Sequence, residues 1–532
     1  MKVLICSNYY PPFSIGGAEI IAHEQAKELV RQGHEVRVFA GRHIDSHERH
    51  SLGVDVVDGI EVWRVALNDY DFSIEQAELR AVDGEAHFCR MLREWRPDVV
   101  HFHNLPGLSF ALPTLAKTNG AVTVMTLHDH WGFCYKNTVI KSPGYGCTDY
   151  EGCAECLPTL HGGRERAIPV RVRRDYIKIA LDAIDCFVSP SVYLADAYTQ
   201  AGFEGHRFAV VSNGLDVNRH SATHKIAAPL MRFSYVGIFA KHKGVIGLIH
   251  AFAALRHPAH LNLVGTGPDE GEYRQLVVEL GCSARVRFWG KVENREMGSV
   301  YAQTDVLVLP SIWRENQPVS ITEAMAGGIP VIASDAGGIP ELIQDGHTGL
   351  LFELGNVKAL TRALTRAIED RRLVDSMGQA ARKAMAGNST EASVRKLVSL
   401  YRAEYKPHRS AGLIIACIGD TFSPVSGDTI ANEMRGNLDV RFVLSDWLTD
   451  SQWQSVGAVL CVDEKFAVAA ALKASQYGVP CLLPAQGEAQ YESSVQIHSY
   501  DSAVTAAHVI RRVEAQSHLR TDASSLAMSD VV

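Results

Sequence analysis

The feature that most constrains this chain is a repeated alternation of short apolar runs with helical patterns. The run KVLICS is followed by a helical pattern from about Ala18 to Gln32, which ends at Gly33, and then by the run EVRVFA. The rhythm continues through DVVHFHN, AVTVMTLHD, DCFVSPS and RFAVVSNG, most of which end in small, polar or histidine residues. This order predicts a parallel sheet with a binding site where its strands end.

A polar, proline-containing segment, HSATHKIAAPLMRF, interrupts the first series, and we place a domain boundary there, near Thr223. A second series follows it: FSYVGIF, LNLVGTG, RVRFWG, DVLVLPS, PVIAS and GLLFE, closed by a helix from about Glu391 to Tyr405. A third, smaller series consists of AGLIIACIGD, LDVRFVL, GAVLCV and GVPCLLPA. The sequence therefore predicts α/β domains at 1–223 and 224–405, an additional α/β unit at 406–515, and a disordered tail at 516–532.

Composition narrows the class of protein. The chain has 532 residues, 46% hydrophobic and 21% charged, which suits globular domains of roughly 150 residues each. The formal net charge of −8 argues against a nucleic-acid partner, because no basic excess is present to neutralise phosphates. No apolar run reaches the ~18 residues of a membrane span, and the opening segment is too short in its apolar part for a signal peptide. We therefore expect a cytoplasmic protein.

The segment WRENQPVSITEAMAGGIPVIAS places Glu315 and Glu323 eight positions apart. Proline suits the start of a helix and paired glycines suit its end, so we expect a helix from about Pro318 to Ala326. Its positive end would offer the N–H groups of Val319 and Ser320 to a phosphate. Glu323, deeper in the helix, could accept hydrogen bonds from a ribose diol, and Glu315 in the loop is free to meet another hydroxylated group. Two solvated glutamates around a helix start are the alternative interpretation.

Other strand ends of the same half carry residues that suit a diphosphate. Lys243 and Gly244 follow the first strand in GIFAKHKGVIGL, and Gly265 and Gly267 follow the next in LVGTGPDE. A lysine can pair with the diphosphate, and glycines permit a close approach of the backbone. Any one of these features is weak evidence, but their succession along one half favours a donor site.

With these residues the chain resembles the retaining glycosyltransferases of family 4. Three features carry the resemblance. They are the spacing of eight positions between Glu315 and Glu323, the segment AMAGGIPVIAS that follows Glu323, and Lys243, which stands directly before a glycine. It covers about residues 1–405 and implies the GT-B fold. The fold class expected is therefore α/β with two facing Rossmann-like domains, an N-terminal acceptor domain and a C-terminal donor domain, plus the smaller C-terminal α/β appendage.

The resemblance also implies roles for individual residues. Glu323 would bind the nucleotide ribose, Glu315 would approach the donor sugar, and Lys243 would neutralise the diphosphate. Two positions depart from the family: Ile238 stands where an arginine is common, and Pro318 where glycine is usual. Diphosphate neutralisation then falls on Lys243, with Lys241 and Arg314 as candidate helpers.

The N-terminal half supplies candidates for the facing wall. Gly16 and Gly17 in PPFSIGGAE resemble the family's first loop, which approaches the donor diphosphate and the acceptor; alternatively, they only make a turn. His128, in TLHDHW, matches the family histidine that lines the donor sugar, although a strand-end histidine is more often a satisfied polar residue. Asp129, in the same motif, and Asn213, in SNGLD, are expected on the acceptor side.

A cluster of four cysteines, Cys134, Cys147, Cys153 and Cys156, ends in a C-x-x-C spacing that suits a structural zinc site. Reduced thiols or a redox-sensitive pair are the alternatives. Cysteines that stand alone in apolar strands, such as Cys6 and Cys186, predict a reducing compartment.

The segment GGRERAIPVRVRRDYIK concentrates positive charge in an otherwise acidic chain. It is either a solvated helix start or a contact for anionic lipid head groups or a lipid-diphosphate acceptor. The arginines concerned are Arg164, Arg166, Arg171, Arg173 and Arg174. The second interpretation places the protein peripherally at the inner face of the plasma membrane.

Together these features predict an enzyme that moves a sugar from a UDP-, GDP- or ADP-sugar to an acceptor hydroxyl. The acceptor would be a glycan or a lipid-linked glycan, in bacterial surface or extracellular polysaccharide or glycolipid assembly. Neither a catalytic metal nor another cofactor is expected, so positive side chains, amides and a helix end must stabilise the leaving diphosphate. The residues expected to be catalytic are Glu315, His128 and Lys243. A non-catalytic sugar-nucleotide sensor or assembly subunit is the runner-up, and a nicotinamide oxidoreductase is disfavoured because the first loop lacks G-x-G-x-x-G.

Overall fold

The structure is a computed structural model, and it forms two compact units. The first unit comprises Met1–Leu79, Val99–Phe110 and Thr123–Glu404, and the second comprises Arg80–Asp98, Ala111–Val122 and Tyr405–Val532. The residues described are 1–13, 16–43, 49–68, 79–141, 145–147, 150, 156, 159–162, 166–216, 226–293, 296–404, 414–418, 441–444, 458–461, 481–484 and 497–500. For Tyr145, 159–162, 166–172 and the strands beyond residue 413, the backbone alone is described.

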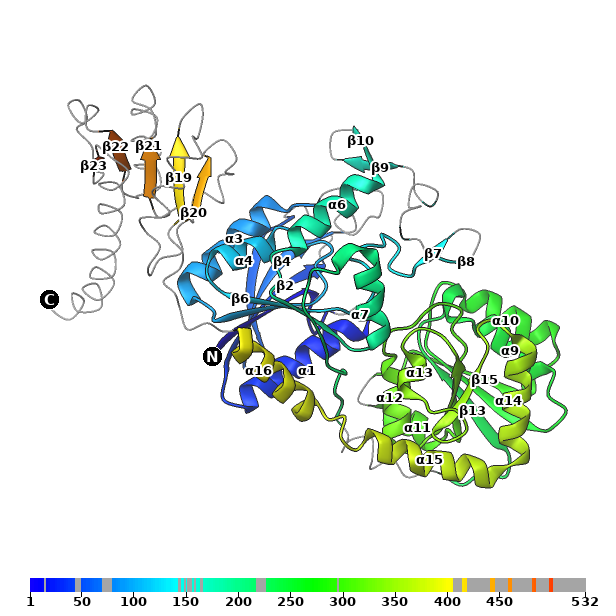
Figure 1. Cartoon of the computed structure of the whole chain (residues 1–532). Coiled ribbons are helices and arrows are strands. Elements are labelled where there is room, and N and C mark those ends of the chain that lie inside the picture. The colour runs from blue at the N-terminus through cyan, green and yellow to red at the C-terminus, as the bar shows by residue number, and fades with distance from the viewer. Residues whose placement is uncertain are drawn as a thin grey trace. The chain divides into compact units, whose positions relative to one another are not determined.

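The N-terminal part of the chain forms an eight-stranded sheet in the order β12-β11-β6-β5-β1-β2-β4-β3 (Figure 1). Its strands are β1 (Lys2–Tyr9), β2 (Glu35–His43), β3 (Leu52–Val57), β4 (Ile60–Leu67), β5 (Val99–Phe102), β6 (Val122–Thr126), β11 (Cys186–Ser189) and β12 (Phe208–Val210). The register is parallel from β1 to β2 and β5, whereas β3 pairs antiparallel with β4. Strands β1, β5 and β6 are buried along nearly their whole length, as their continuous apolar runs predict.

The helices of this part within the first unit are α1 (Gly17–Arg31), α6 (Val170–Leu181), α7 (Val192–Tyr198) and the π-helical turn η1 (Thr199–Phe203). Four short strands form two small antiparallel pairs, β7 (Ile140–Lys141) with β8 (Tyr145–Gly146) and β9 (Thr159–Gly162) with β10 (Arg166–Pro169).

The second sheet is all parallel, in the order β15-β14-β13-β16-β17-β18. Its strands are β13 (Met231–Val236), β14 (Ala259–Val264), β15 (Val286–Gly290), β16 (Val306–Leu309), β17 (Val331–Ser334) and β18 (Gly349–Phe352). This is the doubly wound Rossmann order, whose direction reverses between β13 and β16. Ligands in such sheets bind at the carboxyl ends of the strands beside that reversal, so the fold directs attention to the loops after β13 and β16.

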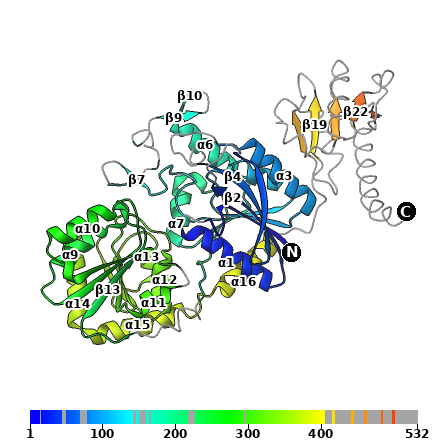
Figure 2. The same ribbon diagram turned by 180° about the vertical axis from the view of Figure 1, so that it is seen from behind.

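Helices cover both faces of the second sheet (Figures 1 and 2). The helical segments are η2 (Lys241–Lys243), α9 (Val245–Ala253), α10 (Glu270–Glu279), η3 (Ser283–Arg285), α11 (Met297–Ala302), α12 (Val319–Ala326), α13 (Ile339–Leu342), α14 (Val357–Glu369) and α15 (Arg371–Met385). Helix α9 packs with α10 and α14, and α12 packs with α15. The fully buried strand residues between these layers form one continuous apolar core.

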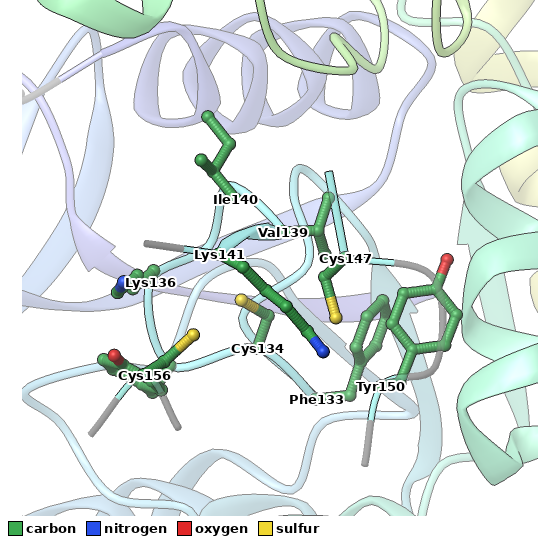
Figure 3. Close-up of a pocket in the computed structure, with 10 residues that line it drawn as sticks. Phe133, Cys134, Lys136, Val139, Ile140, Lys141, Cys147, Tyr150 and Cys156 are labelled. Carbon is green, nitrogen blue, oxygen red and sulfur yellow. The ribbon is translucent and has the colours of Figure 1, made fainter. Parts of the chain in front are cut away.

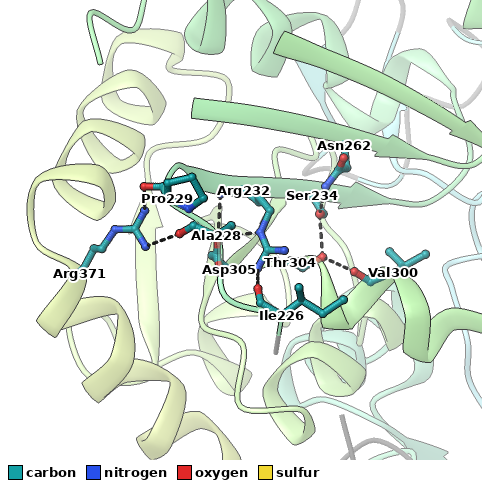
Figure 4. Close-up of polar contacts among 10 residues, drawn as sticks. All are labelled: Ile226, Ala228, Pro229, Arg232, Ser234, Asn262, Val300, Thr304, Asp305 and Arg371. Atoms are coloured by element: carbon teal, nitrogen blue, oxygen red, sulfur yellow. Dashed lines mark hydrogen bonds and ion pairs between the residues drawn. The ribbon is translucent and has the colours of Figure 1, made fainter. Parts of the chain in front are cut away.

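A partly buried polar network fixes the base of this sheet (Figure 4). The Arg232 guanidinium donates to both carboxylate oxygens of Asp305, at 3.1 and 3.0 Å, and to the carbonyl of Ile226. The Ser234 and Thr304 hydroxyls lie 2.7 Å apart on the adjoining strand and loop. Because β13 and β16 share these contacts, the register of the two central strands is held where their amino ends meet.

Two crossing segments connect the halves of the first unit. Leu215 pairs with Ser389, and a methyl group on Gly214 would lie only 2.5 Å from the Cα of Thr390. Helix α16 (Thr390–Glu404) then returns to the N-terminal half and packs beside α1 (Figures 1 and 2). The glycine of SNGLD therefore serves the close approach of the two crossings.

The second unit contains α3 (Val82–Trp95), α4 (Leu112–Thr118) and a five-stranded parallel sheet in the order β20-β19-β21-β22-β23. Its strands are β19 (Ile414–Ile418), β20 (Arg441–Leu444), β21 (Ala458–Cys461), β22 (Cys481–Pro484) and β23 (Ile497–Tyr500). The third sequence series predicts the first four of these strands. The boundaries near Thr223 and after Tyr405, and the tail at 516–532, lie outside the described residues.

The α/β class with two Rossmann-like sheets is confirmed. Helices predicted at 18–32, 318–326 and 391–405 correspond to α1, α12 and α16 within about two residues. Within the described residues, no helix combines the length and the apolar character that crossing a membrane requires.

Candidate active site

A cleft of about 900 Å³ opens among the carboxyl ends of the strands of both large sheets. The predicted residues that line it are Gly16, Gly17, His128, Asp129, Asn213, Lys243, Glu315, Val319, Ser320 and Glu323. Among the residues predicted to bind the donor, Gly265 and Gly267 do not line it. The structure thus brings together side chains that are some three hundred positions apart in sequence.

Glu315 is a buried carboxylate with two polar partners. Lys243 Nζ lies 2.7 Å from Glu315 Oε1, and the Ser311 hydroxyl donates to the same oxygen at 2.6 Å. The lysine also lies 4.9 Å from the centroid of the Trp313 ring. The acid and the lysine that the sequence treats separately therefore form one ion pair at the cleft. That Glu315 meets a hydroxylated group of a ligand stays a prediction.

Helix α12 begins where the sequence predicts a phosphate-binding end. Pro318 is its N-cap, with an extended backbone, and its carbonyl accepts the N–H of Ile321. Val319 and Ser320 line the cleft, and their N–H groups precede that first bond, so these amides and the helix dipole can receive an anion. Glu323, about one turn further on, is half-buried and accepts a hydrogen bond from the Tyr301 hydroxyl at 2.7 Å.

The glycines after β14 have a packing role. Gly265 has φ +135°, and a methyl group there would lie 1.9 Å from the Gly237 carbonyl oxygen. A methyl group on Gly267 would lie 2.3 Å from the Phe239 carbonyl oxygen. These residues let the loop after β13 pass against the loop after β14. Donor binding by Gly265 and Gly267 stays a prediction. Gly17, in contrast, lies against Val319 across the cleft, where a methyl group on the glycine would be 3.4 Å from the valine side chain.

The loop after β1 is held by a buried arginine on β4. Arg64, only 2% exposed, donates to the carbonyls of Tyr10 and Pro11 at 2.9 and 2.6 Å and to the Asp55 carboxylate. The loop then leads to Gly16, whose N–H is bonded to Glu19 Oε2 at 2.8 Å. An arginine inside the fold thus positions the glycine loop that faces α12.

His128, which is half-buried, stands at the end of a row that continues through the buried His103 and His101. Its Nε2 lies 2.8 Å from His103 Nδ1, and His101 lies between the Tyr401 hydroxyl and the Thr126 hydroxyl, at 2.6 and 2.7 Å. Burial lowers the pKa of His128 to about 4 and that of His101 to about 3. His128 is therefore neutral near pH 7 and faces the cleft as an uncharged hydrogen-bonding group.

Asp129 is a carboxyl whose pKa is raised. Burial raises the pKa of Asp129 to about 7, Glu19 adds to the rise, and the N–H of Trp131 and the charge of Arg173 oppose it. Asp129 Oδ1 accepts the Trp131 N–H at 2.7 Å. A carboxyl that titrates near neutrality therefore lines the cleft beside His128.

The two residues after Glu315 reach across to the N-terminal half. Asn316 Nδ2 donates to the His128 carbonyl at 3.3 Å, and its Oδ1 accepts from the Ser191 hydroxyl. Gln317 Oε1 accepts the N–H of Asn213 at 2.7 Å, and its Nε2 donates to the Ser212 hydroxyl at 2.7 Å.

A second bridge lies beside these contacts. Glu341 accepts the N–H groups of Val192 and Tyr193, both at 2.7 Å, at the start of α7. The sequence interpretation misses Asn316, Gln317 and Glu341. For the first two a signal is present, because both are amides adjoining a predicted site glutamate.

Of the remaining residues named from the sequence, some line the cleft and others do not. Ile238, where the resemblance expects arginine, is about half exposed and lines the cleft, as does Arg173 of the basic segment. The candidate helpers Lys241 and Arg314 do not line it. Arg174 donates to the Tyr150 carbonyl at 2.5 Å. Arg164 lies outside the described residues, and for Arg166 and Arg171 the backbone alone is described.

Comparison with known proteins identifies the class. The model described as Glycosyltransferase Family 4 matches residues 15–219, and the one described as Glycosyl transferases group 1 matches residues 218–384. Sucrose-phosphate synthase from Thermosynechococcus elongatus has a similar fold, with a TM-score of 0.59 and 20% identity over 76% of this chain and 98% of that one. HepE of Anabaena, solved in complex with UDP, gives a TM-score of 0.54 and 18% identity over 76% and 100%. The fold is thus the GT-B fold of glycosyltransferases.

The chain belongs to the group 1 glycosyltransferases, enzymes of class EC 2.4 that take the transferred sugar from a nucleotide-sugar. N-acetyl-alpha-D-glucosaminyl L-malate synthase of Bacillus anthracis is 35% identical over 173 residues, which are 32% of this chain and 44% of that protein. The match therefore spans less than half of that relative's length.

Proposed function

We propose that this protein is a retaining glycosyltransferase that moves a sugar from a nucleotide-diphosphate donor to an acceptor hydroxyl in the cleft. The observation that carries the proposal is the array along one wall: the Lys243–Glu315 pair, the first amides of α12 and Glu323. In this arrangement Glu323 receives the ribose, the α12 amides and Lys243 receive the diphosphate, and Glu315 orients the sugar.

The main chemical demand is charge on the leaving diphosphate. Lys243 and the positive end of α12 supply a fixed positive potential where the negative charge of the diphosphate develops. Both lie in the cleft, where solvent screens their potential only weakly. The donor's own phosphate oxygen takes the acceptor proton, so no side-chain base is assigned. Neutral His128 can hydrogen-bond the sugar without adding a positive charge beside it.

The choice of donor and acceptor is also part of the proposal. HepE, a protein of the same fold, was solved with UDP, which supports testing a UDP-sugar before GDP- and ADP-sugars. Arg173 in the cleft suits an acceptor that carries a phosphate, such as a lipid-linked glycan. We place such a reaction in surface polysaccharide or glycolipid assembly, in the cytoplasm at the inner face of the plasma membrane, without a cofactor.

The experiment is a donor panel read by two signals. UDP-, GDP- and ADP-sugars are screened by thermal shift, because a ligand of the folded state raises the melting temperature. The donor that binds is then used to measure hydrolysis and transfer. Glu323→Ala and Lys243→Ala are expected to lower donor turnover at least about a hundredfold, whereas Glu272→Ala, an exposed glutamate on α10, leaves it unchanged.

The second candidate, a non-catalytic sugar-nucleotide sensor, is favoured by Ile238, an exposed apolar side chain at a cleft position where positive charge would serve catalysis. The same panel separates the two. Donor binding without any hydrolysis or transfer, in a protein whose circular dichroism spectrum is intact, would establish the sensor and overturn the enzyme.

A further inference from the structure

Two asparagines line the cleft where the neighbouring strands β1 and β5 end. These strands are paired as far as Cys6 and Phe102, and two backbone hydrogen bonds continue the pairing. The N–H of His103 donates to the Cys6 carbonyl at 2.8 Å, and the N–H of Asn8 donates to the Asn104 carbonyl at 2.7 Å. Asn8 and Asn104 therefore project from adjacent strands, which lie roughly 5 Å apart.

The side chains of this pair have unmet hydrogen-bonding capacity. Asn8 is only 6% exposed, and Oδ1 of Asn8 and Oδ1 of Asn104 are both buried without a partner among the described residues. Trp131, which follows the next strand, β6, also lines the cleft, and its indole N–H lacks a partner in the same way. Buried polar groups of native proteins are nearly always paired, because an unpaired one destabilises the fold. Three such groups where neighbouring strands end indicate that a ligand supplies the partners.

The unpaired atoms define the chemistry of that ligand. An amide oxygen only accepts a hydrogen bond and an indole N–H only donates one, whereas a hydroxyl group does both. Two adjacent hydroxyls can therefore serve both asparagines, and a hydroxyl oxygen can accept from Trp131. A carboxylate has no hydrogen to donate, so two amide oxygens disfavour it. The χ2 torsion of asparagine is soft, which lets each amide turn toward the cleft that it lines.

The surroundings of the pair suit a ring. Phe110 and Trp131 both line the cleft, and their rings are stacked with centroids 5.6 Å apart and planes inclined by 25°. Aromatic surface of this kind can cover the carbon face of a ligand while a few polar groups fix its orientation. A sugar and a cyclitol are the rings that combine a carbon face with adjacent hydroxyls.

The pair also adjoins the residues expected at the donor sugar. His103, the residue before Asn104, has its Nδ1 2.8 Å from Nε2 of His128. His128 and Asp129 line the same cleft. A ring held by the asparagines is thus held beside the place where the proposed function puts the transferred sugar.

A smaller hollow shares two lining residues, Tyr135 and Lys136, with the cleft (Figure 3). Its cysteines are free thiols: Cys134, Cys147 and Cys156. No group of three His, Cys, Asp or Glu side chains among the described residues could hold a metal ion, and Cys153 lies outside them, so zinc binding stays a prediction from the sequence alone. What this loop adds to the cleft is the ammonium group of Lys136, which can meet a phosphate elsewhere on the acceptor.

We propose that Asn8 and Asn104 select the acceptor of this enzyme by binding two adjacent hydroxyl groups of a sugar or cyclitol ring. Trp131 donates to one of these hydroxyls, and a hydroxy acid with a single hydroxyl is excluded. The inference rests on the proposed function, because it assigns the acceptor of that reaction. The asparagines determine specificity and take no part in proton transfer.

Leucine substitutions separate this role from a structural one. Asn8→Leu and Asn104→Leu remove amides that have no partner in the fold, so the melting temperature should stay the same or rise. Asn262→Leu is the matched control, at an asparagine that is 8% exposed in the other large sheet. Its amide donates to the Ser234 hydroxyl at 3.2 Å and accepts the indole N–H of Trp289 at 3.1 Å. Losing these bonds should lower the melting temperature by a few degrees.

The functional readout is the ratio of transfer to donor hydrolysis in the full-length protein, with the donor that the panel identifies. Methyl glucoside, methyl mannoside and myo-inositol are offered as acceptors, and L-malate is offered as the hydroxy acid. We expect transfer to a ring compound. Each leucine variant should lower kcat/KM for that acceptor at least about tenfold, while hydrolysis, in which water is the acceptor, changes less than about twofold. Asn262→Leu should keep the wild-type ratio.

A deoxy analogue of the accepted ring tests the contact itself. Removing one of the two adjacent hydroxyls should lower kcat/KM in the wild type, but have little further effect in the leucine variant that has lost the matching amide. Effects that multiply in full would show that the amide and the hydroxyl do not meet.

Two results of the main experiment overturn the inference. One is transfer to L-malate in preference to every ring compound. The other is a lowered melting temperature with unchanged acceptor use in both leucine variants, since the asparagines would then hold ordered water as part of the fold.

Failure of the proposed function is recognised separately, because the protein then turns over no donor at all. Binding is in that case measured by thermal shift with UDP and the same ring compounds. A rise in the melting temperature of the wild type that is lost in both leucine variants supports the inference, and no rise with any ring compound overturns it.

Discussion

At the scale of single residues, the pair of Lys243 and Glu315 has two tasks. It neutralises a carboxylate that is only 7% exposed, and it places a cation where a diphosphate is proposed to lie. Sequence reasoning names both residues but not their contact, because 72 positions separate them and only the fold brings the loops after β13 and β16 together.

A double substitution separates the two tasks. Lys243→Met should lower the free energy of unfolding by about 3–5 kcal/mol, because it leaves a buried carboxylate without its cation. Lys243→Met with Glu315→Gln should recover most of that loss in urea denaturation, yet still fail to turn over the donor. Recovery of turnover in the double variant would show that the pair is structural alone.

The raised pKa of Asp129 gives a pH dependence with a definite sign. The folded protein keeps the Asp129 proton up to about pH 7, whereas the unfolded chain releases it near pH 3.8. The stability from this group is full below pH 3.8 and is lost as pH rises through about 7, with a slope of at most about 1.4 kcal/mol per pH unit.

Asp129→Asn keeps an oxygen for the Trp131 N–H and removes the titration. The difference in unfolding free energy, variant minus wild type, should therefore grow between about pH 4 and 7 and level off above. Urea denaturation at a series of pH values measures it. Taking the difference removes the contribution of His101 and His128, whose lowered pKa values change stability with pH in the opposite direction. A difference that does not vary with pH would contradict the raised pKa of Asp129.

At the scale of elements, the glycines after β14 allow a matched comparison. Gly267→Ala should destabilise the protein by more than about 1 kcal/mol, since its methyl group meets the Phe239 carbonyl oxygen. Gly271→Ala, on the exposed face of α10 with open space around it, should instead stabilise by up to about 1 kcal/mol. Thermal unfolding of the two variants checks the pair, and equal effects would show that the contact between the loops is relieved elsewhere.

Sequence pattern predicts every strand of the second large sheet, and in the first it misses two neighbours, β3 and β4. The apolar runs of β13, β14, β16 and β17 are continuous because helices cover both sides. The pattern does not predict β3, because this is an edge strand with Val54 and Val56 exposed. A signal for it is nevertheless present: Asp58 and Gly59 both have positive φ and form the Asp-Gly hairpin turn between β3 and β4.

At the scale of the first compact unit, the donor-site loop is tied to the opposite half by amide side chains. Glu315 contacts residues of its own half, while Gln317, two positions later, bonds Ser212 and Asn213. Any movement of one half against the other must therefore alter the loop that carries the sugar-orienting carboxylate.

Gln317→Ala removes this bridge without touching the ion pair. We expect kcat/KM for the donor to fall by about tenfold, because the hydrogen bonds that the Gln317 amide makes contribute about 1–2 kcal/mol to holding the loop. Gln275→Ala, an exposed glutamine on α10, is the control and should change kcat/KM little. Unchanged kinetics in Gln317→Ala would show that the bridge belongs to packing alone.

The return of α16 to the N-terminal half has a consequence for biosynthesis. Val394, Leu397 and Tyr401 are buried, and His101 of β5 meets the Tyr401 hydroxyl. A nascent chain that has emerged only to residue 216 therefore carries a first sheet whose α1 still lacks its neighbour, and it must wait on the ribosome while the whole second sheet is translated. Until then the apolar surface that α16 will cover is exposed, and chaperones can bind it. A stop codon after Ser389 would remove α16 together with everything that follows it, and the loss of α16 would damage the part of the protein that was translated first.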